Sequence, residues 1–230
     1  MHKHKILFKF ASRSRPHQFF HCLANTLNRL ADRQHSQFLI SLDEDDASIN
    51  NTAVKSRLCD YLPHNLRVVW GSSHSKIHAI NRDMQHAAAW DILICLSDDM
   101  LFSMHGFDDL VRDEFGRDLD QVLHFPDGNR SDLITLAVLG KTYYDRFGYI
   151  YHPEYRSVYG DNEMTDVAVL LGKKKFVNKP IVIHAHPAYG RAAMDALYIR
   201  NESRALHAHD TMVYEQHKKN NFGLSRWRRS

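Results

Sequence analysis

The chain has 230 residues, of which 43% are hydrophobic, and a formal net charge of +3 at pH 7. This length suits one large α/β domain or two small ones, and the apolar content is enough for a substantial core. The longest apolar runs, "LITLAVLG" and "VAVLLG", are far shorter than the roughly 20 residues of a membrane-spanning helix. The beginning, "MHKHKILFKF", lacks the long apolar region of a secretory signal, so we expect a cytoplasmic protein.

Strand-like and helix-like segments alternate along the first hundred residues. The segments expected to be buried strands are residues 5–11, 37–43, 66–71 and 91–97, and those expected to be helices are residues 16–33, 47–62 and 75–90. Pro16 suits a first helical turn, and Phe20, Leu23, Leu27 and Leu30 then recur at helical spacing. This alternation predicts an α/β fold with a mostly parallel central sheet flanked by helices.

The alternation is less regular after residue 99. The segments expected there are a helix at 106–115, strands at 121–125 and 134–140, a helix at 161–172 and a last extended segment at 175–187. We find no linker rich in Pro, Gly or Ser. We therefore expect a single domain over residues 1–230. Its expected parts are a nucleotide-sugar half at about 5–100, an acceptor half at about 101–200, and a C-terminal helix with a basic tail at 201–230.

Polar segments follow three of the predicted strands: "SRSRP", "DEDD" and "SDD". Ligands of open parallel sheets bind beyond the carboxyl ends of the strands, where these segments converge. Asp98 and Asp99 cannot both be buried as unpaired ions, whereas a hard divalent cation would compensate both charges. The arginines and carboxylates therefore predict a site for a phosphorylated ligand and a divalent cation. In the alternative interpretation, one carboxylate caps the next helix and the other faces water.

The order "KILFKFASRSRP", "ISLDEDD", "INRDMQHAAAWDILICLSDDM", "GDNEMTDVA" and "IVIHAHPAYG" resembles the family 2 glycosyltransferases of the GT-A fold, over residues 5 to about 190. The resemblance implies that "SDD" is the D-x-D motif, which holds Mg²⁺ or Mn²⁺ on the diphosphate of a nucleotide-sugar, usually a UDP-sugar. Ser97 stands where many members have Asp. Asp99 is then the expected metal ligand, and Asp98 is expected near the nucleotide-sugar.

The resemblance also implies which other residues bind the nucleotide-sugar. They are Ser12, Arg13 and Arg15 after the first strand, Asp43 and Asp45 after the second, and Lys76 and Asn81 on the helix before the acidic motif. Guanidinium groups suit this role because they pair with phosphate oxygens in a bidentate manner. The alternatives left open are arginines that flank a helix start, and a solvated helix face for Lys76 and Asn81.

Two further motifs would complete the catalytic site. The "GDNE" segment matches the family's catalytic loop, so the resemblance implies a general base there, with Asp161 preferred over Glu163. Asp161 could instead be an ordinary N-cap. In "HAHP", His184 and His186 lie on one side of an extended strand, and His186 is the candidate to complete the metal site. Imidazole with carboxylates suits Mn²⁺ better than Ca²⁺.

The resemblance implies transfer with inversion to an acceptor hydroxyl, on a carbohydrate or another molecule. A nucleotidyltransferase that makes nucleotide-sugars is one alternative, although "ASRSRP" lacks the glycines of a triphosphate loop. A non-catalytic nucleotide or nucleic-acid binding module is another, although the acidic strand ends would repel nucleic acid, and we expect no nucleic-acid partner. The basic stretch "HKKNNFGLSRWRRS" could contact an anionic membrane surface peripherally.

Overall fold

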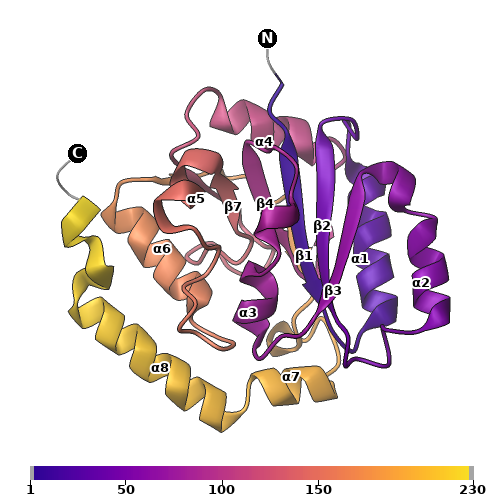
Figure 1. Ribbon diagram of the computed structural model, residues 1–230. Coiled ribbons are helices and arrows are strands. Elements are labelled where there is room, and N and C mark those ends of the chain that lie inside the picture. The colour runs from indigo at the N-terminus through magenta and orange to yellow at the C-terminus, as the bar shows by residue number, and fades with distance from the viewer. Residues whose placement is uncertain (1–2, 228–230) are drawn as a thin grey trace.

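The molecule is built around a central β-sheet. Within residues 3–227, which the computed structural model describes, its strand order is β3, β2, β1, β4, β7, β6 and β8. The strands of this sheet are β1 (Ile6–Ser12), β2 (Ser36–Asp43), β3 (Leu66–Gly71), β4 (Ile92–Leu96), β6 (Val122–His124), β7 (Val138–Gly140) and β8 (Lys174–Phe176). Figure 1 shows β1 in the middle, with β2 and β3 on one side and β4 and β7 on the other.

The pairing is mostly parallel, as predicted. Strand β1 pairs in parallel with β2 and β4, and β2 pairs in parallel with β3. Only around β7 do the pairs become antiparallel, with β4 on one side and β6 on the other. Because parallel neighbours end at the same edge of a sheet, the segments after β1, β2 and β4 meet at one edge.

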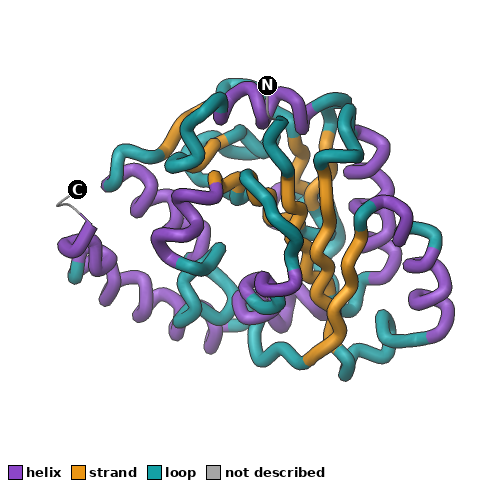
Figure 2. Tube along the Cα trace, turned by 45° about the horizontal axis from the view of Figure 1, so that its top comes forward, coloured by secondary structure: helices purple, strands orange, loops and turns teal. Residues whose placement is uncertain are grey.

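Helices cover both faces of this sheet (Figures 1 and 2). The helices are α1 (Pro16–Arg29), α2 (Thr52–Cys59), α3 (Lys76–Asn81), α4 (Phe107–Phe115), α5 (Lys141–Phe147), α6 (Gly160–Leu170), α7 (Ala196–Asn201) and α8 (Arg204–Lys219). Apolar side chains of α1, α2 and α4 pack in one cluster, and those of α3, α5 and α6 pack in a second. Two layers of helices around one sheet make the single α/β domain that the sequence predicts.

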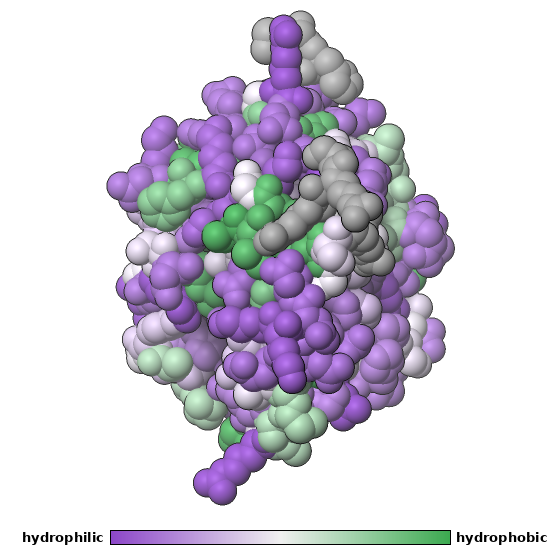
Figure 3. All heavy atoms as spheres, turned by 90° about the vertical axis from the view of Figure 1, so that its left-hand side faces the viewer, coloured by the Kyte–Doolittle hydropathy of each residue, from purple (hydrophilic) through white to green (hydrophobic). Residues whose placement is uncertain are grey.

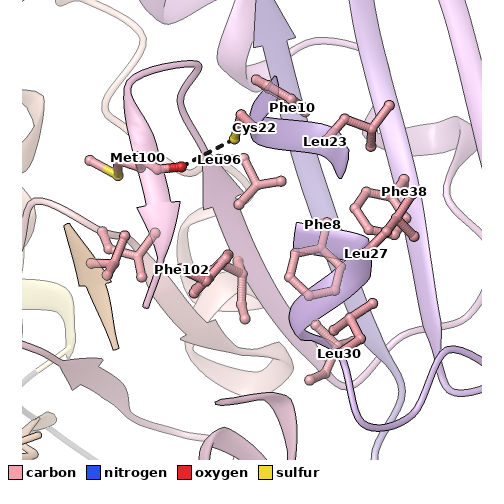
Figure 4. Packing of buried hydrophobic residues seen from close by; sticks show 14 of the residues in the cluster. Phe8, Phe10, Cys22, Leu23, Leu27, Leu30, Phe38, Leu96, Met100 and Phe102 are labelled. Carbon is pink, nitrogen blue, oxygen red and sulfur yellow. Dashed lines mark hydrogen bonds between the residues drawn. The ribbon is translucent and has the colours of Figure 1, made fainter. Parts of the chain in front are cut away.

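The period-2 alternation of β1 divides its side chains between the two clusters. Phe8 belongs to the first, where it stacks on Phe38 with ring centroids 4.7 Å apart, and its neighbour Leu7 belongs to the second. Figure 4 shows the first cluster, in which Cys22 Sγ donates to the carbonyl of Met100 at 3.2 Å. All side chains of β1 except Ala11 are buried, which accounts for the mostly apolar character of this strand, and Lys9 is the charged residue buried within it.

Several predicted elements differ from those observed. The helix expected at 75–90 ends at Asn81, because Asp83 adopts a left-handed φ of 72° and a separate 3₁₀ turn follows at Met84–His86. The helix expected at 47–62 begins only at Thr52, where the Asn51 side chain accepts from the Val54 backbone N–H. The strand expected at 134–140 is confined to β7. Helix α5 and strand β5 (Met100–Phe102) lacked a predicted counterpart.

The C-terminal region closes the molecule beside the strand ends. Strand β9 (Val182–His184) pairs antiparallel with β5, and α7 and α8 then run along the lower edge in Figure 1. The buried Asp210 on α8 accepts hydrogen bonds from the backbone N–H groups of Arg156, Ser157 and Val158. Helix α8 thereby holds the loop that precedes α6. No helix within residues 3–227 has both the length and the apolar character needed to cross a membrane.

Candidate functional site

A cavity of about 1020 Å³ lies at the carboxyl ends of β1, β2 and β4. The predicted residues that line it are Ser12, Arg13, Arg15, Asp43, Asp45, Lys76, Asp98, Asp99, Asp161 and His186. The cavity is also bordered by α7 and by the residues just before α6. The structure therefore brings together ten of the twelve residues that we singled out from the sequence.

Asp98 is buried and fully engaged by the segment after β1. Its Oδ2 accepts from Ser12 Oγ at 2.7 Å, and its Oδ1 accepts from Arg15 Nη1 at 3.0 Å. The side chains of both residues are only 7% exposed. The guanidinium of Arg15 therefore compensates the charge of the Asp98 carboxylate where little water reaches it. Asp98 thus fixes the conformation of the loop after β1 rather than presenting a free oxygen to the cavity.

Asp99 is arranged differently. Its Oδ2 accepts from the Tyr198 hydroxyl at 2.7 Å and lies 3.4 Å from His184 Nε2. Its Oδ1 is buried and has no hydrogen-bond partner among the described residues. Burial raises the pKa of Asp99, but hydrogen bonding and charge from His184 outweigh it and hold the pKa below its usual value. An ionised oxygen that is buried and unpartnered fits a divalent cation, because a cation would supply the missing partner.

The histidine that contacts this carboxylate is His184, whereas we singled out His186 from the sequence. Its Nδ1 lies 3.4 Å from Asp127 Oδ2, so the imidazole bridges two carboxylates. Burial acts to lower the pKa of His184, but hydrogen bonds to Asp127 and Asp99 raise it to about 9. His186 lies nearby, with its ring centroid 5.3 Å from that of His184, but its Nε2 contacts Glu202 Oε1 at 3.0 Å.

The acids after β2 hold Arg13. Its guanidinium donates to Asp45 through both Nη atoms, at 2.6 and 2.8 Å, and Nη1 also donates to Asp43 Oδ2 at 2.9 Å. Hydrogen bonding from Asp45 is the main reason why the pKa of Arg13 is raised above its usual value. Asp43 is buried, whereas the Asp45 side chain is 67% exposed. Arg13 therefore orients Asp43 at the end of the cavity formed by β2.

Asp161 lies in the first turn of α6 and faces the same cavity. It is not the N-cap, because Tyr159 holds that position with a left-handed φ of 64°. Burial raises the pKa of Asp161, and the positive charge of Lys76 opposes this rise. A carboxylate with a raised pKa in a cavity has the properties of a general base. Lys76 also lines the cavity, and its charge acts on Asp161 there.

Two predicted residues, Asn81 and Glu163, do not line this cavity. Asn81 Oδ1 accepts from the backbone N–H groups of Ile150 and Tyr151, and its Nδ2 donates to the Tyr151 carbonyl at 2.6 Å. Glu163 Oε2 accepts from the Tyr155 hydroxyl and contacts His217 Nδ1, each at 2.7 Å. Asn81 secures the segment before α6, and Glu163 points to the opposite side of that helix from the cavity.

Helix α7 contributes contacts that the sequence did not indicate. Asp195, its N-cap, accepts from Arg15 Nε at 2.7 Å and from Nη2 at 2.8 Å. The Tyr198 ring lies under the same guanidinium, whose carbon is 3.8 Å from the ring centroid. No periodicity links a helix this far along the chain to the loop after β1. For His184, by contrast, the alternation of "HAH" at the end of a predicted strand did indicate that this side chain could reach the site.

The chain matches no protein-family model and no curated protein sequence. It is similar in structure to the mannosyltransferase PcManGT from Pyrobaculum calidifontis in complex with GDP-Man and Mn²⁺, with a TM-score of 0.62 and 12% identity over 78% of this chain and 56% of that chain. TarS 1-349 from S. aureus in complex with UDP-GlcNAc gives a TM-score of 0.58 and 12% identity, over 78% and 58%.

GalNAc-T7 with UDP, GalNAc and Mn²⁺ gives a TM-score of 0.65 and 12% identity, over 79% of this chain and 43% of that chain. The chain has a GT-A-like fold. It spans 43 to 58% of the length of these three solved chains. The cavity of the GT-A-like domain lies at the carboxyl ends of its parallel strands, where the fold binds ligands.

Proposed function

We propose that this protein transfers a sugar from a nucleoside-diphosphate-sugar, with UDP-sugar as the first candidate, to an acceptor hydroxyl. The observation that carries the proposal is the buried, unpartnered Oδ1 of Asp99, next to His184 in a large cavity at the strand ends. Solved structures of similar fold, in complexes with GDP-Man, UDP-GlcNAc or UDP, support the donor class. We propose that residues 5–100 form the donor half and residues 101–200 the acceptor half.

Asp99 and His184 would hold a divalent cation, for which we propose Mn²⁺ or Mg²⁺, and His186 could join them after leaving Glu202. When bound, the cation would supply positive charge to the diphosphate of the donor. Arg15 adds a fixed guanidinium at the same end of the cavity and suits a phosphate oxygen pair. Ser12 and Asp98 orient Arg15, and Arg13 orients Asp43 toward the nucleoside.

Asp161 is the proposed general base. Its carboxylate takes the proton of the acceptor hydroxyl while the acceptor oxygen attacks the anomeric carbon and the bond from that carbon to the diphosphate breaks. Attack from the side opposite the leaving group inverts the anomeric configuration. Lys76 lines the same cavity, and its positive charge favours the ionised form of Asp161. Glu163 is left out of this role because its carboxylate faces Tyr155 and His217.

The acceptor proposed is a carbohydrate or another molecule with a free hydroxyl. A peripheral contact between the basic stretch at 217–230 and an anionic membrane surface stays a prediction, and residues 228–230 lie outside the described part of the chain. The same holds for the cytoplasmic location.

The test is a calorimetric titration of UDP into the protein, with Mn²⁺ and then with EDTA. We expect binding that needs Mn²⁺ and that Asp99→Asn weakens at least tenfold. Asp113→Asn, which changes an exposed carboxylate on α4, is the matched control and should bind like the wild type. If UDP does not bind, GDP and the other nucleotides are titrated under the same conditions. Absence of binding for every nucleotide would refute the proposed donor site.

Turnover separates the proposed transferase from the alternatives. A glycosyltransferase releases UDP from a UDP-sugar, slowly to water and faster with a suitable acceptor. A nucleotidyltransferase would instead release pyrophosphate from UTP and a sugar 1-phosphate. Metal-dependent nucleotide binding without either reaction, over a panel of donors and acceptors, would favour a binding module.

A further inference from the structure

A second cluster of metal-ligating side chains lies outside the donor cavity, between the loop before α6, the first turn of α6 and the end of α8. It consists of His152, Glu163 and His217, each of which offers one ligand atom within 4.8 Å of the other two. His217 Nδ1 is 2.7 Å from Glu163 Oε2, and the ring centroids of His152 and His217 are 4.4 Å apart. We propose that these three residues bind a zinc ion.

The donor set fits zinc better than the harder metals. Two imidazoles with one carboxylate, and a fourth position for water or another oxygen, are a common tetrahedral zinc arrangement in proteins. Magnesium and calcium prefer sites built from oxygen atoms alone. The exposed carboxylate of Glu154 lies beside the cluster and is a candidate for the fourth position or for an outer contact.

The surrounding hydrogen bonds already orient the ligands. His217 Nε2 lies 3.2 Å from Glu154 Oε2 on the edge of the ring opposite to Glu163. If Nδ1 binds zinc, this carboxylate holds the second ring nitrogen, as outer carboxylates do for zinc-bound histidines. The Tyr155 hydroxyl donates to Glu163 Oε2 at 2.7 Å and fixes the third ligand. The cluster therefore needs only small side-chain shifts to surround an ion.

Charge compensation also favours a cation at this position. The Glu163 side chain is 7% exposed, and its Oε2 contacts Nδ1 of His217, whose side chain is 14% exposed. A buried carboxylate is costly unless it is paired with positive charge. A dication between Glu163 and the two imidazoles would supply that charge, and Glu154 would bring the site close to neutrality.

A zinc ion here would tie the end of α8 to the catalytic side of the domain. Glu163 lies two positions after Asp161 on α6, and His217 lies near the end of α8. Figure 1 shows α8 along the outer edge of the molecule, below α6, and Figure 3 shows the largely hydrophilic face on this side. Asp210 and Tyr214 already join α8 to the residues around α6, and zinc would add a third link near its end. The proposal does not depend on the glycosyltransferase activity.

The experiment titrates zinc, buffered with nitrilotriacetate, into the full chain after its metals have been stripped. The Asp99→Asn background weakens zinc binding in the donor cavity. We expect one tight zinc per chain and a higher melting temperature. His217→Ala and His152→Ala should each weaken zinc binding at least tenfold. The matched control, His105→Ala, removes an exposed histidine outside the cluster and should change nothing.

Cobalt adds a spectroscopic readout. We expect Co²⁺ to give the intense visible absorption of a four-coordinate site, and His217→Ala to abolish it. Equal zinc binding by all variants would mean an adventitious ion only and would overturn the proposal, as would no tight zinc at all. Circular dichroism shows whether His217→Ala folds. If it does not, zinc binding by His217→Gln and His152→Ala tests the proposal in its place. UDP binding with Mn²⁺ should persist when His217→Ala or His152→Ala is made in the chain that keeps Asp99, so failure of the zinc site and failure of the donor site are distinguishable.

Discussion

The Tyr198 hydroxyl donates a hydrogen bond to Asp99 Oδ2 at 2.7 Å across 99 positions of sequence. The same tyrosine lies under the Arg15 guanidinium, which Asp195 also engages with two hydrogen bonds. Helix α7 thus contacts both groups that we assign to the diphosphate, the carboxylate with its cation and the arginine. Any nucleotide that uses Arg15 must compete with Asp195 for it.

We therefore expect Asp195→Asn to tighten UDP binding in the presence of Mn²⁺. Asn keeps the N-cap of α7, which Asp195 provides through the Tyr198 backbone N–H, but it removes the negative charge. A partly exposed ion pair contributes up to about 1 kcal/mol, which corresponds to roughly fivefold in affinity. Calorimetry with UDP measures the change.

Two controls belong to that experiment. Asp145→Asn removes the carboxylate of a different ion pair, with Lys141 on α5, and should leave UDP affinity unchanged. In an Arg15→Ala background, Asp195→Asn should no longer tighten binding. Weaker binding in Asp195→Asn itself would mean that α7 supports the donor site rather than competing with the nucleotide.

Asp161→Asn should abolish transfer but keep metal-dependent UDP binding. Loss of a positioned general base costs about 10²- to 10⁴-fold in rate. Burial raises the pKa of Asp161, and only its deprotonated form can accept a proton, so transfer should rise with pH through that raised pKa. Because the charge of Lys76 opposes the rise, Lys76→Met should move the acid limb to still higher pH.

A pH profile of kcat/KM for the wild type, Asp161→Asn and Lys76→Met checks these expectations. If Glu163 were the base, Glu163→Gln would lose transfer and Asp161→Asn would retain most of it, which would contradict our assignment.

Asn81→Ala should destabilise the fold without weakening UDP binding, since Asn81 bonds the backbone of Ile150 and Tyr151 rather than lining the cavity. Leaving such partners unsatisfied costs roughly 1–3 kcal/mol each when they are buried. Urea unfolding and UDP calorimetry give the two readouts. Lys76→Met on the same helix is the contrasting variant, and it should weaken UDP binding with little change in unfolding. The opposite result would return Asn81 to the donor site.

The sequence was most informative where local patterns and long-range contacts agree. Strands β1, β2, β3 and β4 were predicted because mostly apolar runs end in polar segments, and parallel pairing then fixes where those ends meet. The convergence of Arg15, Asp43 and Asp99 followed from that topology. Helix breaks such as the one at Asp83 were missed because a left-handed residue in a helical pattern has no strong local signal.

The contribution of α7 could not be predicted for a different reason. Asp195 and Tyr198 reach the site only because β9 returns beside β5 and directs the chain across the strand ends. Nothing in the spacing of these residues indicates that return. The contact between His184 and Asp99 was missed at the same step, since the register of β9 decides which imidazole faces Asp99. Such contacts depend on tertiary packing and not on periodicity.

Lys9 is a fully buried lysine in the middle of β1. Its Nζ donates to Ser41 Oγ at 2.5 Å, and Ser41 in turn donates to Asp83. Burial lowers the pKa of Lys9 to about 8. Between that value and its ordinary pKa of 10.5, the unfolded chain binds more protons at this lysine than the folded chain does. The free energy of unfolding should therefore rise with pH across this window and lose the gain below it.

The rise at this one site should reach about 3 kcal/mol, because each unit of pKa shift corresponds to about 1.4 kcal/mol. Urea unfolding at pH 7, 8, 9 and 10 should show a steeper rise for the wild type than for Lys9→Met, which cannot titrate. Other groups that titrate in this range are common to both proteins, so the difference in slope isolates Lys9. Lys179→Met, an exposed lysine, should keep the wild-type slope. Equal slopes for the wild type and Lys9→Met would mean that water reaches Lys9 and that its charge is already accommodated.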